Sequence, residues 1–118
     1  EIVWQIPHGA TPDNVRNHPA LAGLTIPRTG RLGRIGTLVT KSLVIAGEGG
    51  VFTTPSGERG AMLRAYDKVS GAEVGEVYLP APQTGSPMTY VLDGRQYLVV
   101  AVSGGGQSGE LIALRLPN

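Results

Sequence analysis

Apolar residues occur along this chain in short runs, each ended by glycine, proline or charged residues. No window of ten or more residues places apolar side chains at the i, i+3, i+4 and i+7 spacing of an amphipathic helix. The runs are rich in valine, isoleucine and leucine and have the length of β-strands. We therefore predict strands over residues 2–6, 37–40, 43–47, 62–67, 73–79, 87–92, 96–102 and 110–116.

The connections between these predicted strands alternate between tight and loose. The tight turns are 40–43, 67–72 and 93–94. The loose connections are rich in glycine or proline and comprise 7–35, 48–60, 80–85 and 103–109. Alternate connections of an antiparallel meander lie at the same end of the sheet. The loose loops should thus gather at one end, where binding residues usually lie, unless they are only tolerated insertions.

Composition supports strands over helices and limits the partners. The 118 residues include 18 glycines and 9 prolines, which suit short strands joined by turns. The formal net charge of +1 provides no basic surface for nucleic acid, which we exclude as a partner. The chain has no cysteine and therefore no disulfide or thiolate metal site. Its apolar runs are far shorter than the roughly 20 residues that cross a bilayer.

The stretch GGGQSG at residues 104–109 matches the dinucleotide-binding pattern G-x-G-x-x-G. That pattern has a physical basis where its last glycine begins a helix, whose N-terminal N–H groups bind the pyrophosphate. The following residues, ELIALRLPN, leave no room for a crossover helix and a second strand. We therefore interpret the stretch as a glycine loop between two antiparallel strands.

Residues 65–71 have the spacing A-x-D-x-x-S-G, which suits a β-hairpin. We predict that the Asp67 carboxylate accepts hydrogen bonds from turn N–H groups and that Gly71 adopts a positive φ. Partial copies of the same unit are found on either side of it. The chain thus divides into the last strand of one unit (1–6), a complete four-stranded unit (36–79) and three strands of another (86–116).

This spacing resembles the blade signature A-x-D-x-x-[ST]-G-x-x-x-W of the pyrroloquinoline-quinone (PQQ) dehydrogenases, which are eight-bladed β-propellers. The matching residues are Ala65, Asp67, Ser70 and Gly71. Trp4 resembles the tryptophan of the preceding blade, whereas Gly75 stands where the next tryptophan is expected, so one contact between blades is lost. Further stretches are similar to C-terminal segments of the membrane-bound glucose dehydrogenase type: GTLVTKSLVIAG, LRAYDKVSG, GSPMTYVLDGRQYLVVAVSGGG and ELIALRLP.

The resemblance implies an all-β fold of antiparallel four-stranded propeller blades, of which this chain forms about two, incompletely. It implies the C-terminal part of an enzyme that oxidises a glucose-like aldose or an alcohol by hydride transfer to PQQ, assisted by Ca²⁺. Ubiquinone or a cytochrome would accept the electrons. The enzyme would be periplasmic, with an upstream segment as its anchor to the inner membrane. The alternative is a non-catalytic propeller scaffold that binds other proteins.

The resemblance also assigns a cofactor-binding segment. The residues Gly33, Arg34, Ile35 and Gly36 are similar to a family stretch that lines the PQQ pocket. The glycines would let the backbone approach a flat ring, and Arg34 could pair with a PQQ carboxylate. The family's Ca²⁺ ligands and catalytic aspartate match nothing in this chain. We therefore assign it no catalytic or metal-binding residue, and we expect these 118 residues alone to bind no cofactor and to be inactive.

The histidines and arginines have simpler interpretations. His8 and His18 are too far apart for a zinc pair without further ligands, and we place both on the loop surface. Arg28, Arg31 and Arg34 form a basic cluster that faces either an anion or solvent.

The remaining candidates are Asp13, Glu48, Trp4 and the last strand. Asp13 and Glu48 could act as acid–base groups, but neither has an identifiable partner in the sequence. Trp4 is expected to pack between blades rather than to stack on a quinone. The strand at 110–116 lacks a fourth strand beside it. We expect its open edge to pair with another strand and to cause weak self-association of the isolated piece.

Overall fold

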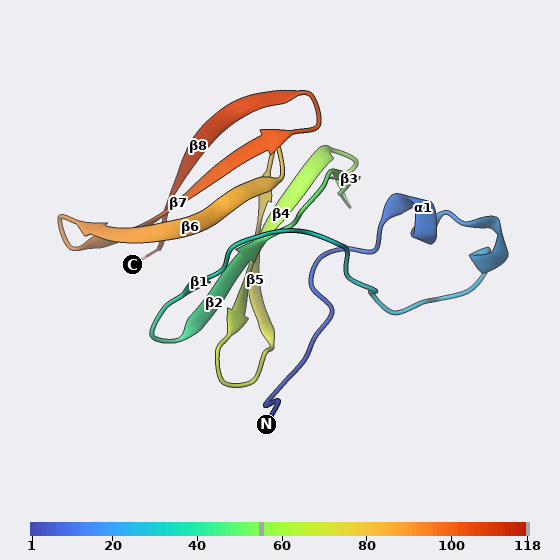
Figure 1. The fold of residues 1–118 in the computed structure, drawn as a ribbon, viewed down its shortest axis with the longest axis horizontal. Helices are drawn as coiled ribbons and strands as arrows, with labels where there is room; N and C mark the ends of the chain where they lie inside the picture. Colours follow the sequence, from blue (N-terminus) through green and yellow to red (C-terminus); the bar gives the residue numbers. More distant parts are fainter. Residues whose placement is uncertain (55, 118) are drawn as a thin grey trace.

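The computed structural model describes residues 1–54 and 56–117 and contains two antiparallel β-sheets (Figure 1). In the first sheet β1 pairs with β2, β2 with β4, and β4 with both β3 and β5. These strands are β1 (Leu38–Val39), β2 (Leu43–Gly47), β3 (Phe52–Thr53), β4 (Arg59–Asp67) and β5 (Glu73–Leu79). In the second sheet β7 lies between β6 and β8. These strands are β6 (Gln83–Leu92), β7 (Arg95–Gly104) and β8 (Gln107–Arg115).

The hydrophobic core lies between the two sheets. Alternate residues of each central strand point into it, as the period of two in a β-strand requires. Its buried members are Ile45, Leu63, Leu79, Ala81, Leu98, Val100 and Val102. The all-β prediction is confirmed, and the two stacked antiparallel sheets have the arrangement of neighbouring propeller blades.

Tight turns and loops lie at opposite ends of the sheets. In Figure 1 the β1–β2, β4–β5 and β6–β7 turns point toward the lower left. The connections that precede β4, β6 and β8 lie toward the upper right. Two of these connections are shorter than predicted, because β6 already begins at Gln83 and β8 at Gln107. Gly105 and Gly106 turn the chain with φ of 64° and 88°, so the G-x-G-x-x-G match is part of a β-hairpin.

Residues 7–31 form an arm that leaves the sheets and returns. The two ends of the arm are joined by a hydrogen bond from Arg31 N to His8 O (2.9 Å). The arm contains a four-residue helix, α1 (Asp13–Arg16), and a 3-10 turn over Pro19–Leu21, and it extends to the right in Figure 1. Neither helical element contains a buried residue, in agreement with the lack of amphipathic periodicity. No helix of the described residues has the length and apolar character needed to cross a membrane.

The arm is attached to the first sheet through Asp13. Its carboxylate accepts hydrogen bonds from Thr53 N (3.3 Å) and from the Arg59 guanidinium (3.1 Å). Asp13 therefore has partners that the sequence did not reveal, and they lie some 40 residues away in the chain.

The segment at 2–6, predicted as the last strand of a preceding unit, forms no strand within the described residues, and its pairing with that unit stays a prediction. This segment pairs with no strand of the described residues, and Ile2 and Val3 are highly exposed. Its apolar side chains favour strand formation, but a strand also needs a neighbour with which to exchange backbone hydrogen bonds. The segment is held instead by Trp4.

Trp4 contacts the β4–β5 hairpin in the way expected of a residue between blades. Its Nε1 donates to Lys68 O (3.0 Å), and its indole lies against Gly71, where a Cβ would come within 2.7 Å of the ring. Gly71 has a φ of 74°, as predicted. The Asp67 carboxylate accepts hydrogen bonds from Ser70 N (2.8 Å) and Val69 N (3.0 Å), and the bond from Ser70 N is the main cause of its lowered pKa.

Candidate cofactor-binding site

The predicted cofactor segment, residues 33–36, leads into β1 at the loop end of the sheets. It lies beside the first residues of β6, so it sits where the two sheets meet. Gly36 N donates to Gly85 O (3.3 Å), and Gly36 O accepts from the side-chain amide of Gln83 (2.8 Å). This segment is therefore held mainly by the second sheet.

Both glycines of the segment are required by close backbone approach. A Cβ on Gly36 would lie 2.8 Å from Ser86 Cα, and one on Gly33 would lie 3.1 Å from Gly49 Cα. Conversely, a Cβ on Gly49 would come within 2.6 Å of Gly33 Cα. The chain therefore has little room for a side chain at Gly33 and none at Gly36.

The two residues between these glycines have different surroundings. Arg34 is exposed, and its guanidinium has no hydrogen-bond or ion-pair partner within residues 1–54 and 56–117. Ile35 is half-buried and lines a cavity of about 420 Å³ together with Trp4, His8 and Tyr66. The site thus presents one cationic group beside a flat stretch of backbone.

The three arginines of the predicted basic cluster do not act together. Arg28 pairs with Glu73 (2.7 Å). Arg31 turns inward, where its guanidinium stacks 4.5 Å from the Phe52 ring centroid. Burial lowers the pKa of Arg31, against the opposing influence of nearby carboxylates. Only Arg34 remains without a partner among the described residues, so the expectation of a single basic patch is wrong.

Glu48 has several partners that the sequence does not reveal. Its side chain is 0% exposed, and its carboxylate accepts from Arg64 Nη2 (2.9 Å) and Nε (3.0 Å). It also accepts from Ala10 N (2.7 Å) and Met62 N (3.3 Å), which joins the arm to β4. No sequence pattern marks this pair, because Glu48 directly follows β2 and Arg64 lies 16 residues further on, within β4.

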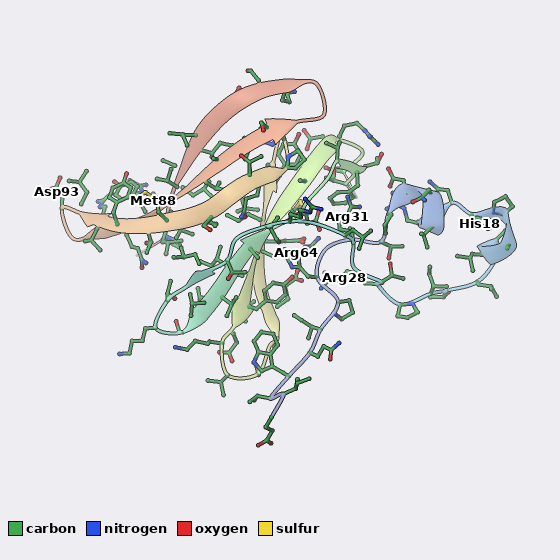
Figure 2. All side chains as sticks on the ribbon, in the orientation of Figure 1. His18, Arg28, Arg31, Arg64, Met88 and Asp93 are labelled. Carbon is green, nitrogen blue, oxygen red and sulfur yellow. The ribbon has the colours of Figure 1, made fainter. Side chains whose placement is uncertain are left out.

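Arg64 is the centre of a charged network at this place. Its Nη1 lies 2.8 Å from both Glu73 Oε1 and Glu76 Oε2 on β5. Burial opposes the charged guanidinium, but the adjacent carboxylates outweigh it and raise the pKa of Arg64. Figure 2 shows Arg28, Arg31 and Arg64 close to where the arm meets the first sheet.

The two histidines differ in their surroundings. His8 Nε2 lies 2.8 Å from Gly47 O and therefore carries the proton, because a carbonyl can only accept. Its Nδ1 lies 2.8 Å from the Tyr66 hydroxyl. The surface placement predicted for His8 is thus wrong. His18 lies at the exposed tip of the arm in Figure 2, as predicted, and accepts a hydrogen bond from Ala20 N (3.2 Å).

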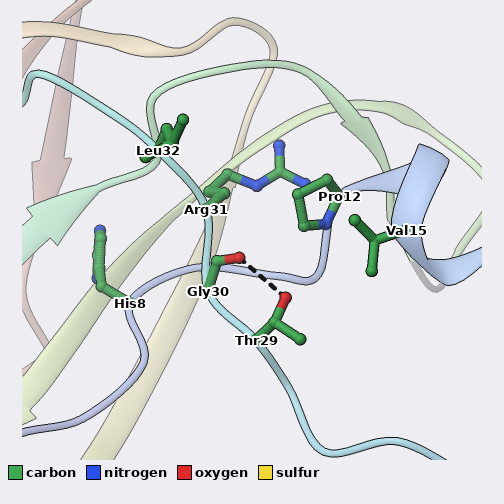
Figure 3. Close-up of a pocket in the computed structure, with 7 residues that line it drawn as sticks. All are labelled: His8, Pro12, Val15, Thr29, Gly30, Arg31 and Leu32. Atoms are coloured by element: carbon green, nitrogen blue, oxygen red, sulfur yellow. Dashed lines mark hydrogen bonds between the residues drawn. The ribbon is translucent and has the colours of Figure 1, made fainter.

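A second cavity, of about 390 Å³, lies at the base of the arm (Figure 3). His8, Leu32 and Val15 line it with the arm backbone near Gly30. Its walls contain no carboxylate, and no cluster of three or more His, Asp or Glu side chains suited to a metal ion exists among the described residues.

Comparisons with known proteins identify the family. Residues 1–98 match the model described as the PQQ glucose/ethanol/alcohol dehydrogenase β-propeller domain. The chain is 30% identical to quinoprotein glucose dehydrogenase A of Acinetobacter calcoaceticus over 100% of its own length. It is 32% identical to the probable quinate dehydrogenase (quinone) of Xanthomonas campestris pv. juglandis over 99% of its length. The chain belongs to the PQQ-dependent dehydrogenase β-propeller family.

The chain spans only 14% of the length of each of these two relatives. A third relative, the quinoprotein glucose dehydrogenase of Escherichia coli (strain K12), is 36% identical over 48% of this chain and 8% of its own length. No solved structure gives a significant match. The resemblance predicted from the blade signature is thereby confirmed.

Proposed function

We propose that this chain forms two neighbouring blades of a dehydrogenase that oxidises a sugar or alcohol with PQQ. The family match over residues 1–98 carries this proposal. The named activities of the relatives, toward glucose and quinate, favour a substrate with several hydroxyl groups. We place the active enzyme in the periplasm, with ubiquinone or a cytochrome as its electron acceptor and an upstream anchor to the inner membrane.

The residues at 33–36 fit one edge of PQQ, which is a flat ring system that carries several carboxylates. Gly33 and Gly36 pack against Gly49 and Ser86 on the side where a Cβ would stand, so we propose that a ring meets the opposite side of this backbone. Arg34 has an exposed guanidinium without a partner among the described residues, and it can form paired hydrogen bonds with a carboxylate. When bound, PQQ accepts a hydride from the carbon that carries the substrate hydroxyl.

In this arrangement the chain contributes binding and orientation. We propose that Arg34 holds a cofactor carboxylate, while the backbone of residues 33–36 limits how far the ring can shift. We assign the Ca²⁺ ligands and the general base to residues of the whole enzyme outside this chain. On its own, the 118-residue chain is then expected to show no dehydrogenase activity.

Removal of the Arg34 guanidinium tests the proposal in the whole dehydrogenase. Arg34→Ala should raise the PQQ concentration for half-maximal reconstitution of the apoenzyme by about tenfold, which corresponds to about 1.4 kcal/mol for a charge-assisted hydrogen bond. The PQQ concentration that Arg34→Lys needs should lie between those of the parent and Arg34→Ala, because lysine keeps the positive charge but not the planar guanidinium.

Arg95→Ala is the matched control. Arg95 is also an exposed arginine, but it follows the Asp93-Gly94 turn at the opposite end of the sheet. Its loss should leave reconstitution unchanged. Equal PQQ affinity in Arg34→Ala, Arg95→Ala and the parent enzyme would remove Arg34 from the cofactor site.

A further inference from the structure

Gln83 joins three backbone segments at the loop end of the two sheets. It is the first residue of β6, and only 3% of it is exposed. Its Oε1 accepts a hydrogen bond from Gly47 N (2.6 Å) at the end of β2. Its Nε2 donates to Gly36 O (2.8 Å) and to Gly85 O (2.6 Å). One side-chain amide therefore links β2, the segment that leads into β1, and the start of β6.

The surroundings of Gln83 are shaped to this amide. A Cβ on Gly47 would lie 2.6 Å from Gln83 Cβ, so the close approach of β2 and β6 requires a glycine at position 47. The bonds use one acceptor and both donors of the amide, so the complete functional group is satisfied. A carboxylate of equal length would point an oxygen at two carbonyl oxygens. An apolar side chain would remove the Gln83 partner of Gly47 N and Gly36 O and would leave Gly85 O with only the long bond from Gly36 N.

Strand pairing does little to hold the segment at 33–36. β1, which follows it, is only the two residues Leu38–Val39. The one backbone bond from the segment to the second sheet, from Gly36 N to Gly85 O, is long at 3.3 Å. The shorter bond to Gly36 comes from Gln83. The Gln83 side chain is therefore the main polar link that sets the place of Gly36 relative to the next blade, beside the long backbone bond to Gly85.

We propose that Gln83 is a positioning residue for the cofactor site. It touches no reacting group; it fixes Gly36, and through Gly36 the backbone beside Arg34, at the junction of the two sheets. This inference rests on the proposed function of residues 33–36. A binding segment held in one geometry avoids the loss of freedom that a mobile segment would suffer on binding, so loss of Gln83 should weaken PQQ binding without removing any contact to PQQ.

The test compares Gln83→Met with Gln96→Met in the whole dehydrogenase. Methionine has nearly the shape of glutamine but cannot form these hydrogen bonds. Gln96 is a suitable control because it lies in the same sheet, is half-buried and donates to Thr89 Oγ1 (2.9 Å) near the opposite end. Two quantities are measured: amide hydrogen exchange of residues 33–36 in the apoenzyme, and the PQQ concentration for half-maximal reconstitution.

We expect Gln83→Met to speed exchange at residues 33–36 and to weaken PQQ binding about tenfold, with Gln96→Met like the parent. Gln83→Met should also lower the midpoint of thermal unfolding more than Gln96→Met, because Gln83 is buried and makes three hydrogen bonds. Exchange and PQQ binding are therefore compared at a temperature at which both apoenzymes are folded. Gln83→Asn takes the place of Gln83→Met in both measurements if Gln83→Met does not fold. It keeps the amide but is one methylene shorter, so it should have intermediate effects on both quantities.

Unchanged exchange at residues 33–36 would overturn the proposal whatever the affinity. Faster exchange with unchanged PQQ affinity would overturn the link between Gln83 and the cofactor. Arg34→Ala then distinguishes failure of the proposed cofactor segment from failure of the proposed role of Gln83. If that variant binds PQQ normally, the assignment of residues 33–36 fails; if it binds poorly, only the positioning role of Gln83 fails.

Discussion

Glu48→Ala should be among the most destabilising substitutions in this chain, because it removes one member of a buried ion pair and leaves the other in place. The Glu48 carboxylate is 0% exposed and accepts hydrogen bonds from Arg64, Ala10 N and Met62 N. Alanine would leave the guanidinium without its most buried partner and would remove the attachment of the arm at Ala10. Removal of one member of such a pair costs about 3 to 5 kcal/mol.

The structure favours the lower end of this range. Arg64 keeps Glu73 and Glu76, each with an oxygen 2.8 Å from Nη1, so its charge is not left alone. We therefore expect the free energy of unfolding to fall by about 3 kcal/mol. Glu48→Leu combined with Arg64→Met should cost less than the sum of the two single changes, because the double variant leaves no unpaired buried charge.

Urea denaturation of the apoprotein measures these changes, and hydrogen exchange shows where they act. Exchange should become faster at Ala10 and Met62, whose N–H groups lose their acceptor. Glu58→Ala is the control, because Glu58 is exposed and, among the described residues, its carboxylate accepts a hydrogen bond only from Ser56 (3.2 Å). If Glu48→Ala costs no more than Glu58→Ala, the buried pair is not what holds the arm to the sheet.

Two further predictions concern the sheet surfaces. Gly75→Trp should raise the free energy of unfolding by about 2 kcal/mol, because Gly75 borders an apolar cavity of about 280 Å³ between the sheets and a Cβ there would meet no atom within 4 Å. Gly75→Ser adds very little apolar area and should therefore raise the free energy of unfolding much less. Equal midpoints of thermal unfolding for Gly75→Trp and Gly75→Ser would contradict this prediction. We also propose that the open edge of β8 makes the isolated chain self-associate. Leu111 is 77% exposed, and Leu111→Lys should reduce the average mass of the isolated chain in light scattering. A parent chain that stays monomeric at millimolar concentration would refute this proposal.

Much of the fold follows from local chemistry that the sequence displays. The turn at 67–71 forms because an aspartate, a serine and a glycine stand at the spacing that satisfies its N–H groups, all within five residues. The glycine loop at 104–109 forms a hairpin because Gly105 and Gly106 accept a positive φ that other residues resist. The blade signature is made of such local features, so it identified the family as well as the fold.

The cofactor segment that we propose follows from resemblance, but the residues that surround it do not. Gln83 looks like an ordinary polar residue beside a proline, and only the approach of two sheets surrounds it with three backbone groups. His8 and Tyr66 are 58 residues apart, and Glu48 and Arg64 acquire their pairing from strand register. Residues 2–6 depend on a distant partner in the same way, since their sequence favours a strand but no strand lies beside them among the described residues.

The sequence by itself determined the turns, the strand type and the family, because these depend on residues that are close together in the chain. The tertiary structure decided which polar groups are buried and with what they pair. Burial deprives a charged or polar side chain of water, so its role depends on whichever distant segment supplies its partner. The separate roles of Arg31 and Arg34, three residues apart, follow from this: one is folded inward onto Phe52, and the other is left at the surface, free of partners in the described part of the chain.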